Sequence, residues 1–415
     1  MLLCLGIRVF SQNLVIGPAE EIYSPGFLSR QSSGTGCNDT TADLRPWIDS
    51  DCGWYSEWVA DGVVCHVKKD DSTLITFWPS PNRIQRYEGT LTDIRNTYDP
   101  VTAADTATYQ WGVTSWQPTL NYYANAREYF SGLGKTAAIY LHNIYKTDEG
   151  GLIGFTHNEV FTGTVSVQRQ YSIGIVYSSD MGDTWTFCGE IIKTKADSCN
   201  NDYNIHGVPY LVVGDEFYVY FREVVTGAGV NYSVAKAKIV DVIDAAKLGT
   251  VSAWEKWNGG SNWTNALGGD GVDVLSSRPL EWVNVNIHGD ATRLTSTNNS
   301  PYVLVTSAIK YDTINSVWLD RSAILMFRSD DGLVWDPPEV VIEEAGQSCL
   351  VYPFILALQG GADDGHETSG SFYIYYHKNT LPLPPPATCE GLNFSTYRQR
   401  VSIDISPAIN MLLLD

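Results

Sequence analysis

Residues 178–185 read Ser-Ser-Asp-Met-Gly-Asp-Thr-Trp and separate two short apolar segments of the chain. Those segments have the length and composition of β-strands, so the residues between them are expected to form a turn. In such a turn the side chain of Asp180 can accept hydrogen bonds from backbone amides, and Gly182 can adopt a positive φ. Trp185 can then pack beneath the turn against the strands. The stretch therefore predicts a β-hairpin.

A second stretch, residues 328–335, reads Arg-Ser-Asp-Asp-Gly-Leu-Val-Trp and repeats the spacing of Asp, Gly and Trp. Both stretches resemble the Asp box, S-x-D-x-G-x-T-W, of sialidases and related β-propellers. The second departs from it with Arg at the first position and Val in place of Thr. The resemblance implies a propeller fold, and it implies a scaffold role on the rim for Asp180, Asp330 and Asp331. It concerns two short turns and implies a fold rather than an activity.

The remaining strand-like segments group into repeats of roughly 70 residues, which predict an all-β protein. We expect a single β-propeller over residues 1–415, most simply with five blades, with a six-bladed, sialidase-like ring as the alternative. Residues 1–30 can supply a strand that completes the ring. A helix is expected at Ile239–Lys247, and long loop insertions around 88–135 and 250–285. The five units cover residues 62–78, 137–192, 208–238, 291–342 and 354–405.

The composition restricts the possible partners. The chain has 415 residues, 44% of them hydrophobic, and a formal net charge of -20. A nucleic-acid-binding protein needs a basic surface, and none is evident, so nucleic acid is not an expected partner. Anionic membranes are disfavoured for the same reason. The sequence has no apolar run of about 18 residues, so no membrane span is expected.

Cysteine and asparagine patterns favour a secreted protein. The eight cysteines include three plausible local pairs: Cys37 with Cys52, Cys188 with Cys199, and Cys349 with Cys389. No CxxC motif occurs, and Cys65 lies in an apolar run that suits a buried thiol. The chain has glycosylation sequons at Asn38, Asn231, Asn262, Asn298 and Asn393.

The propeller prediction brings distant residues together, because the innermost strand of each blade starts near the central axis. The motif Asn-Ile-His-Gly occurs at both 204–207 and 286–289. Aligning the units on Gly62, Gly207 and Gly289 gives Asp61, His206 and His288 equivalent inner positions. The nearest counterparts in the other two units are His142 and Tyr352. The adjoining strand ends and the residue after His288 add His157, Glu159, Arg222, Glu223 and Asp290.

These residues suggest carbohydrate chemistry, because glycoside hydrolysis needs one protonated and one ionised carboxyl group across the scissile bond. The chain resembles five-bladed propeller glycosidases, which implies Asp61 as base, Glu159 or Glu223 as acid, and Asp290 or Asp202 as helper. Arg222 next to Glu223 would lower its pKa, which favours Glu159 as the acid.

His206 and His288 complete the catalytic candidates. His142, His157, Arg222, Arg293 and Tyr352 are the candidate substrate-binding residues. Sialidases bind the substrate carboxylate with three arginines. Here Asn82–Gln85 matches their F/Y-R-I-P motif only in part.

The expected partner is a poly- or oligosaccharide, and no cofactor is required. The histidines can also hold a structural Ca²⁺ or another divalent ion on the axis, although imidazole suits transition metals better than calcium. Two further functions stay open. A polysaccharide lyase would use neutral His and Tyr with Arg or a metal. A glycan-binding or extracellular structural propeller would have no catalysis.

Overall fold

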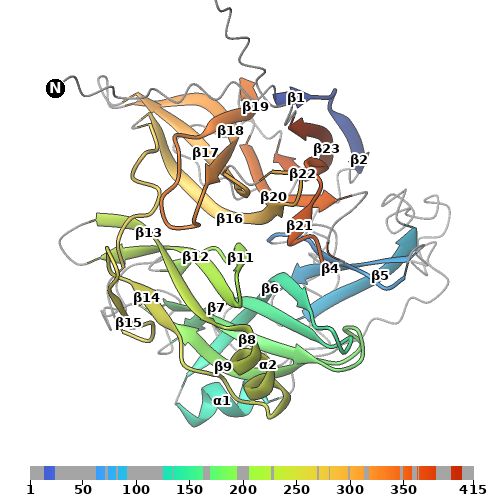
Figure 1. The fold of residues 1–415 in the computed structure, drawn as a ribbon, viewed down its shortest axis with the longest axis vertical. Helices are drawn as coiled ribbons and strands as arrows, with labels where there is room; N and C mark the ends of the chain where they lie inside the picture. Colours follow the sequence, from blue (N-terminus) through green and yellow to red (C-terminus); the bar gives the residue numbers. More distant parts are fainter. Residues whose placement is uncertain are drawn as a thin grey trace, which may run out of the picture.

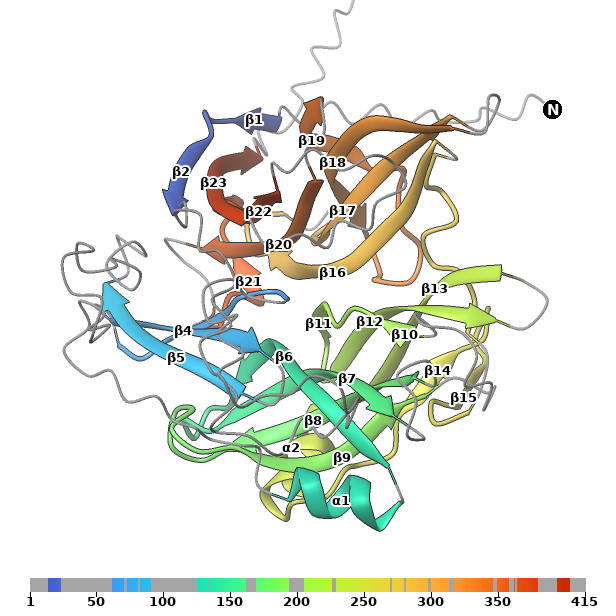
Figure 2. The ribbon, with the colours of Figure 1, turned by 180° about the vertical axis from the view of Figure 1, so that it is seen from behind.

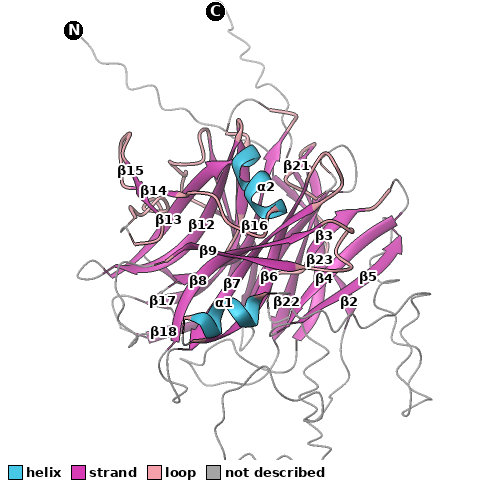
Figure 3. Ribbon diagram, turned by 90° about the horizontal axis from the view of Figure 1, so that it is seen from below, coloured by secondary structure: helices cyan, strands magenta, loops and turns pink. Residues whose placement is uncertain are grey.

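The computed structural model describes residues 14–23, 62–70, 73–80, 83–90, 125–133, 135–161, 169–193, 205–225, 229–268, 271–279, 281–297, 300–312, 317–345, 349–357, 362, 364–379 and 394–403. Strands dominate this part of the chain, and the described residues contain two helices, α1 (Ala126–Gly132) and α2 (Ile239–Lys247). Figure 3 shows both helices in cyan among the strands.

The described strands form five sheets. The first contains β3 (Cys65–Lys68), β4 (Thr73–Ser80) and β5 (Arg83–Thr90). The second contains β6 (Thr136–Lys146), β7 (Leu152–Phe161), β8 (Arg169–Ser178) and β9 (Thr186–Ile192). The third contains β10 (Ile205–His206), β11 (Tyr210–Val213), β12 (Glu216–Val225), β13 (Gly229–Lys238), β14 (Glu255–Trp257) and β15 (Trp263–Asn265).

The fourth sheet contains β16 (Trp282–Leu294), β17 (Tyr302–Asp312), β18 (Val317–Ser329), β19 (Glu339–Ala345) and β21 (Glu367–Thr368). The fifth contains β20 (Cys349–Ala357), β22 (Ser371–Asn379), β23 (Phe394–Ile403), β1 (Leu14–Ile16) and β2 (Glu20–Tyr23). The strand pairs within the sheets are antiparallel, except that β21 pairs parallel with β16. Two strands share one partner in two places: β10 and β11 both pair with β12, and β1 and β2 both pair with β23.

The sheets surround a common centre, toward which β6, β11, β16 and β20 lie (Figure 1). Inner strands of neighbouring sheets contact one another: β3 with β6, β11 with β16, and β16 with β20. Figure 2 shows the same ring from behind, with both helices on its outside near β9. This is a β-propeller, as predicted, and the number of blades stays a prediction.

The N-terminal strands complete the last sheet. Both β1 and β2 pair antiparallel with β23, with Leu14 opposite Ile403 and Glu20 opposite Arg398. Arg398 Nη2 lies 2.7 Å from Glu20 Oε2, which adds an ion pair to the backbone ladder. The prediction that residues 1–30 supply a strand is confirmed. The first and last segments of the described chain therefore belong to one sheet.

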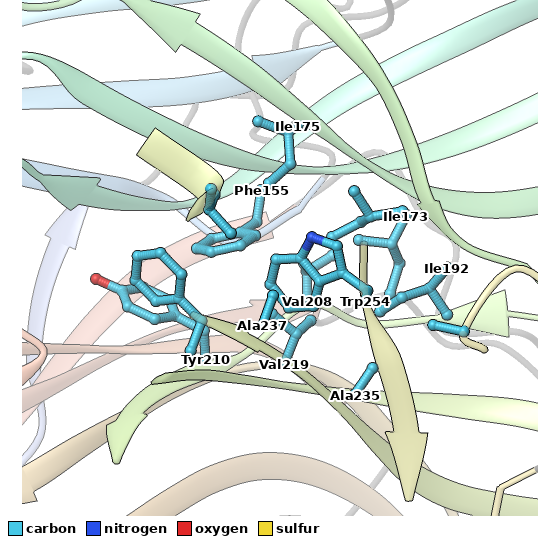
Figure 4. Packing of buried hydrophobic residues seen from close by; sticks show 14 of the residues in the cluster. Phe155, Ile173, Ile175, Ile192, Val208, Tyr210, Val219, Ala235, Ala237 and Trp254 are labelled. Carbon is cyan, nitrogen blue, oxygen red and sulfur yellow. The ribbon is translucent and has the colours of Figure 1, made fainter. Parts of the chain in front are cut away.

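Hydrophobic side chains form separate cores between neighbouring sheets rather than one core at the centre. Figure 4 shows the core between the second and third sheets, where Phe155, Ile173, Val208 and Trp254 pack together. Three further clusters occupy the gaps between the first and second, third and fourth, and fourth and fifth sheets. The apolar faces of the blades are thus satisfied away from the axis, which leaves the axis to polar groups.

The turn at residues 178–185 forms the predicted hairpin between β8 and β9. Asp180 Oδ1 accepts a hydrogen bond from the Thr184 backbone amide at 2.8 Å, and Asp180 Oδ2 accepts one from the Thr184 hydroxyl at 2.6 Å. Gly182 has a φ of +86°. Trp185 is buried, and its indole N–H donates to the Gly182 carbonyl at 3.1 Å.

The second turn, between β18 and β19, uses its two aspartates differently from the sequence alignment. Asp331 Oδ1 accepts from the amides of Leu333 and Val334, at 2.8 and 2.9 Å. Asp330, which the alignment placed opposite Asp180, instead accepts from the Ser300 backbone amide. The shift arises because Ser329, rather than the residue at the first motif position, accepts from the Gly332 amide.

Other local predictions had mixed outcomes. The helix at Ile239–Lys247 is confirmed as α2, and Gly249 follows it with a φ of +70°. The predicted insertion at 250–285 contains two short strands, β14 and β15, that extend the third sheet. Helix α1 lies within the predicted insertion at 88–135 and was not expected. None of the described helices is long and apolar enough to cross a membrane.

One predicted disulfide is wrong. Cys188 is a buried free thiol, so it does not pair with Cys199. Its Sγ donates to the Ala246 carbonyl at 3.6 Å, because β9 packs against α2 at this point. Cys65 is also free and buried, as the sequence suggested. The other two predicted pairs involve residues outside the described part and stay predictions.

Replacing Asp180 with alanine should lower the free energy of unfolding by about 1–3 kcal/mol, because the Thr184 amide loses its acceptor. Urea unfolding followed by tryptophan fluorescence measures the change. Asp215→Ala, an exposed aspartate in the β11–β12 turn, is the matched control and should change stability by less than about 0.5 kcal/mol. Equal effects of the two substitutions would contradict this role of Asp180.

Candidate functional site

The inner strands share a local irregularity at the same level of the axis. The pairing register of β6 shifts between Leu141 and Asn143, that of β16 between Asn286 and Asp290, and that of β20 between Val351 and Phe354. A bulge of this kind bends the strand and redirects a side chain. The residues in these three bulges include His142, His288 and Tyr352.

In the third blade, the inner strand is interrupted between β10 and β11, and this break takes the place of the bulge. His206 ends β10 and pairs with Arg222, whereas Tyr210 begins β11 and pairs with Val219, so the inner side has one extra residue. Gly207, in the break, has a φ of +83°, and a Cβ on it would lie 2.1 Å from an Ile287 side-chain carbon. Glycine is therefore required where the third and fourth blades meet.

Four histidine rings meet at this level. The ring of His288 stacks on that of His142, with centroids 4.7 Å apart. His157 lies 5.0 Å from His288 and 5.2 Å from His206, again between ring centroids. His206 Nδ1 and His288 Nε2 are 3.0 Å apart. All four are predicted catalytic or binding histidines, and they come from three neighbouring sheets.

Burial keeps these imidazoles neutral. It lowers the pKa of His157 to about 3 and that of His142 well below its usual value. It also lowers the pKa values of His206 and His288, with smaller effects from the neighbouring histidines and from the positive charge of Arg222. A neutral imidazole carries one N–H donor and one free acceptor nitrogen, so it can act as a base or bind a metal.

Arg222 and two tyrosines surround the histidines. Arg222 is directly opposite His206 in the β10–β12 pairing, and its Nε is buried without a hydrogen-bond partner. The Tyr171 ring centroid lies 5.0 Å from that of His157 and 5.2 Å from that of His206. Tyr352 lies 5.9 Å from His288 and has a φ of +54°, a conformation that a bulky residue rarely adopts. Such strain is common at functional sites.

Glu159 adjoins this group. It lies two residues after His157 on β7 and therefore on the same face of the sheet. Its partner in the β7–β8 ladder is Tyr171, whose ring contacts His157 and His206. Glu159 is half-buried. The structure thus places this predicted acid on the same face of β7 as His157.

Glu223 has a different environment from the one expected for a catalytic acid. Its Oε2 lies 2.7 Å from Nζ of Lys256, and both side chains are almost completely buried. Its Oε1 accepts from the Ser233 hydroxyl and from the Gly271 amide, each at 2.7 Å. Two of these partners, Ser233 and Lys256, belong to the third sheet, and strand alternation places Arg222 on the face opposite Glu223.

Asp290 lies on the axis, beyond the histidines. Its two oxygens accept from the backbone amides of Ala291 and Ile355, at 2.8 and 2.9 Å. Burial raises its pKa to about 7, the two amides oppose this shift, and the charge of Asp364 adds to it. Because the amide of Ile355 belongs to β20, the Asp290 carboxyl joins the fourth blade to the fifth.

Arg293 does not reach the cluster. It pairs with Glu367 at 2.8 Å, and its side chain is 43% exposed. Asp61 and Asp202 lie outside the described residues. Gly62, next to Asp61 in the chain, packs on the His142 ring, where a Cβ would lie 2.6 Å from Cε1.

Sequence reasoning missed several polar residues of the axis. His66 and His377 are buried, and Asp364 accepts a hydrogen bond from the Lys146 amide at 2.6 Å. His377 Nδ1 lies 2.9 Å from the Thr396 hydroxyl. The alignment of units on glycine overlooked His377 because it lies on β22, the second strand of its blade. Its position among apolar and aromatic residues, Tyr375-Tyr376-His377, was the available indication.

The histidines also offer metal ligands. Among the described residues, the candidate ligand atoms of His157, His206 and His288 all lie within 4.8 Å of one another. The fold and site together define a β-propeller with a buried, histidine-rich axial site.

Comparison with known proteins gives only remote similarities. No protein-family model and no curated protein matches the chain. Among solved structures, a thermostable family-43 glycoside hydrolase has a TM-score of 0.42 and 12% identity. The alignment covers 83% of this chain and 94% of the chain of that hydrolase. The catalytic domain of a Coprinopsis cinerea GH62 α-L-arabinofuranosidase has a TM-score of 0.37 and 8% identity, covering 92% and 95%.

A Dyadobacter fermentans protein of unknown function has a TM-score of 0.39 and 13% identity, covering 82% of this chain and 76% of its own. Similarities this remote identify neither a family nor a substrate.

Removing the charge of Glu223 should lower the free energy of unfolding of the protein. Glu223→Gln leaves the Lys256 ammonium buried without a counter-ion, which costs about 3–5 kcal/mol. The double change Glu223→Gln and Lys256→Met removes both charges and should recover most of that stability. Chemical unfolding of the three proteins measures this. A double variant as unstable as Glu223→Gln would contradict the ion-pair explanation.

The buried histidines predict a loss of stability in acid. The pKa of His377 is lowered by burial to about 4, from an ordinary value near 6.5. The folded state therefore resists protonation, and stability present above pH 6.5 is lost as the pH falls toward 4. His377→Asn keeps a polar group near Thr396 but does not titrate. Its loss of unfolding free energy over this range should be about 3 kcal/mol smaller than that of the wild type. Parallel pH profiles for the two proteins would contradict the assignment.

Proposed function

We propose that the protein is a secreted carbohydrate-active hydrolase that cleaves a glycosidic bond beside the axial histidine cluster. Glu159 is the general acid and Asp61 the base. The observation that carries this proposal is the position of Glu159. It lies on the same face as His157 and opposite Tyr171, where side chains from three blades meet. Glycoside cleavage also needs a second carboxyl group across the scissile bond, and the proposal gives that role to Asp61.

The environments of the other carboxylates support this choice. Glu223 is neutralised by Lys256 and has no free oxygen to offer a substrate. Asp290 uses both oxygens for backbone amides, so we assign it a positioning role: it holds the bulges that carry His288 and Tyr352. Asp61 is retained as base because the adjacent Gly62 packs on His142.

The neutral imidazoles and Arg222 would serve substrate binding. Neutral His side chains can donate to or accept from sugar hydroxyls, and Arg222 offers a cation next to His206. Tyr171 and Tyr352 present aromatic rings with polar tips, which suit a surface that is partly apolar and partly hydrated.

One observation favours a second candidate, a polysaccharide lyase acting on uronate-containing chains. Arg222 Nε has no hydrogen-bond partner, and neutral His157 lies beside Tyr171. Arg222 would neutralise the uronate carboxylate while an imidazole removes the proton α to it. The electron pair would form a C–C double bond, and the glycosidic C–O bond would break as its oxygen takes a proton from the tyrosine.

Secretion is proposed on the sequons and the even number of cysteines. Among the sequon asparagines that the structure describes, Asn262 is exposed in the β14–β15 turn. Asn231 is half-buried, and its amide donates to the Gly271 carbonyl at 2.9 Å. Asn262 is thus the better of the two glycosylation candidates.

The hydrolase is tested with Glu159→Gln assayed on a panel of neutral and acidic glycans. We expect turnover to fall by about 10²–10⁴-fold, because a general acid is lost. The charge-free double variant of Glu223 and Lys256 is the control, and it should retain turnover within a few-fold. Undiminished turnover in Glu159→Gln would contradict the assignment.

Product analysis separates the two enzymes. A hydrolase releases reducing ends without new ultraviolet absorbance, whereas a lyase creates one absorbing double bond per cleavage. Absorbance from uronate-containing chains, abolished by Arg222→Ala, would replace the hydrolase with the lyase. Retention of glycans with no cleavage in any case would indicate a binding protein.

A further inference from the structure

We propose that His157, His206 and His288 bind one divalent transition-metal ion, of the zinc type, on the propeller axis. The three residues come from β7, β10 and β16, which belong to three neighbouring sheets. Their candidate ligand atoms lie within 4.8 Å of one another. The inference does not depend on the proposed hydrolysis, because its evidence is the ligand geometry.

One pair of nitrogens already has the spacing that a shared metal ion needs, and the candidate ligand atoms of all three residues lie within 4.8 Å of one another. Two nitrogens bound to one ion at about 2.1 Å lie about 3.0–3.4 Å apart, for angles between about 90° and 110°. His206 Nδ1 and His288 Nε2 are already 3.0 Å apart. His157 completes the group, and its Nδ1 is a buried atom with no hydrogen-bond partner. The whole of His157 is only 4% exposed, so bulk water has little access to that nitrogen.

The donor set selects the kind of ion. All three ligands are imidazoles, and no carboxylate of the described residues belongs to the group. Calcium prefers six to eight oxygen ligands, whereas imidazole favours zinc, copper, nickel and iron. The ion is therefore expected to be a transition metal rather than Ca²⁺.

Neighbouring residues would support the site and leave one position open. His142 stacks on His288, and its Nδ1 accepts from the Val63 amide at 3.5 Å, so it orients the ring of a ligand without belonging to the ligand group. Arg222 brings a positive charge beside His206. Three neutral ligands leave the ion with its full charge, so the ion and Arg222 together favour an anionic fourth ligand, such as the carboxylate of an acidic sugar.

The test is metal binding by the full chain, measured without any activity assay. Protein freed of metal with a chelator is titrated with Zn²⁺ and with Ca²⁺ by calorimetry, and with Co²⁺ by visible absorption. We expect one equivalent of Zn²⁺, a Co²⁺ ligand-field spectrum typical of nitrogen ligands, and Ca²⁺ binding at least about 100-fold weaker.

Variants identify the ligands. His206→Asn and His288→Asn should each weaken Zn²⁺ binding by more than about 100-fold, because losing a direct ligand exceeds the usual cost of losing a supporting contact. His377→Asn, which removes a buried histidine outside the group, should bind one equivalent like the wild type. Glu159→Gln should do the same, which separates failure of the metal site from failure of the hydrolase.

Several outcomes would overturn the proposal. The first is that the wild type binds neither Zn²⁺ nor Co²⁺. The second is that it binds Ca²⁺ as tightly as Zn²⁺. The third is that His206→Asn binds Zn²⁺ with unchanged affinity. Absence of binding would leave the group as a hydrogen-bonded histidine cluster. If the ligand variants do not fold, the Co²⁺ spectrum of the wild-type protein decides alone: a spectrum without nitrogen ligation rejects the site.

Discussion

The organisation of this protein depends on one constraint: the inner strands of neighbouring sheets contact one another around the axis. Apolar side chains consequently pack between the sheets, as the four clusters show. At the axis, strands from different blades face one another through polar side chains and backbone groups. Burying a polar group without a hydrogen bond costs free energy, so many polar groups at the axis form a hydrogen-bonded network in place of an apolar core.

That network joins blades that are far apart in the chain. Asn143 donates to the Val208 carbonyl at 2.7 Å, and the Tyr210 hydroxyl donates to the Ile144 carbonyl at 2.8 Å, which joins the second blade to the third. Asp290 joins the fourth to the fifth through the Ile355 amide. Because these contacts hold the bulged segments, they also fix the directions of the histidines. Stability of the ring and geometry of the site therefore share the same residues.

Much of this arrangement could be predicted from local sequence. The two turns, helix α2 and the strand supplied by the N-terminus depend on short-range patterns, and such patterns are visible in a single sequence. His206 and His288 were found because the same four residues, Asn-Ile-His-Gly, precede equivalent strands. The assignment of Asp330 failed at the level of one residue, because two adjacent aspartates fit the motif and only the hydrogen bonds distinguish them.

The residues that sequence could not place depend on long-range partners. Glu223 resembled a catalytic acid next to Arg222, but strand alternation turns the two side chains to opposite faces. Its counter-ion, Lys256, lies in β14, a strand with too few residues to be recognised. His66 and Asp364 likewise belong to different blades, and only closure of the ring brings them near one another. In a sheet, the neighbour in sequence is thus a poor guide to the electrostatic environment of a side chain, because its neighbours in space are i±2 or cross-strand residues.

Tyr352 shows how the network and the site are linked energetically. A bulky residue with a φ of +54° carries a conformational cost of about 1–3 kcal/mol, and it persists only where surrounding contacts determine the backbone. The amide of Ile355, three residues later, is held by Asp290, which itself follows His288 by two residues. The carboxyl that fixes the strained bulge of β20 therefore also fixes the bulge of β16. A substitution at Asp290 would release both bulges together, so its effects on the histidine cluster and on the fold cannot be independent.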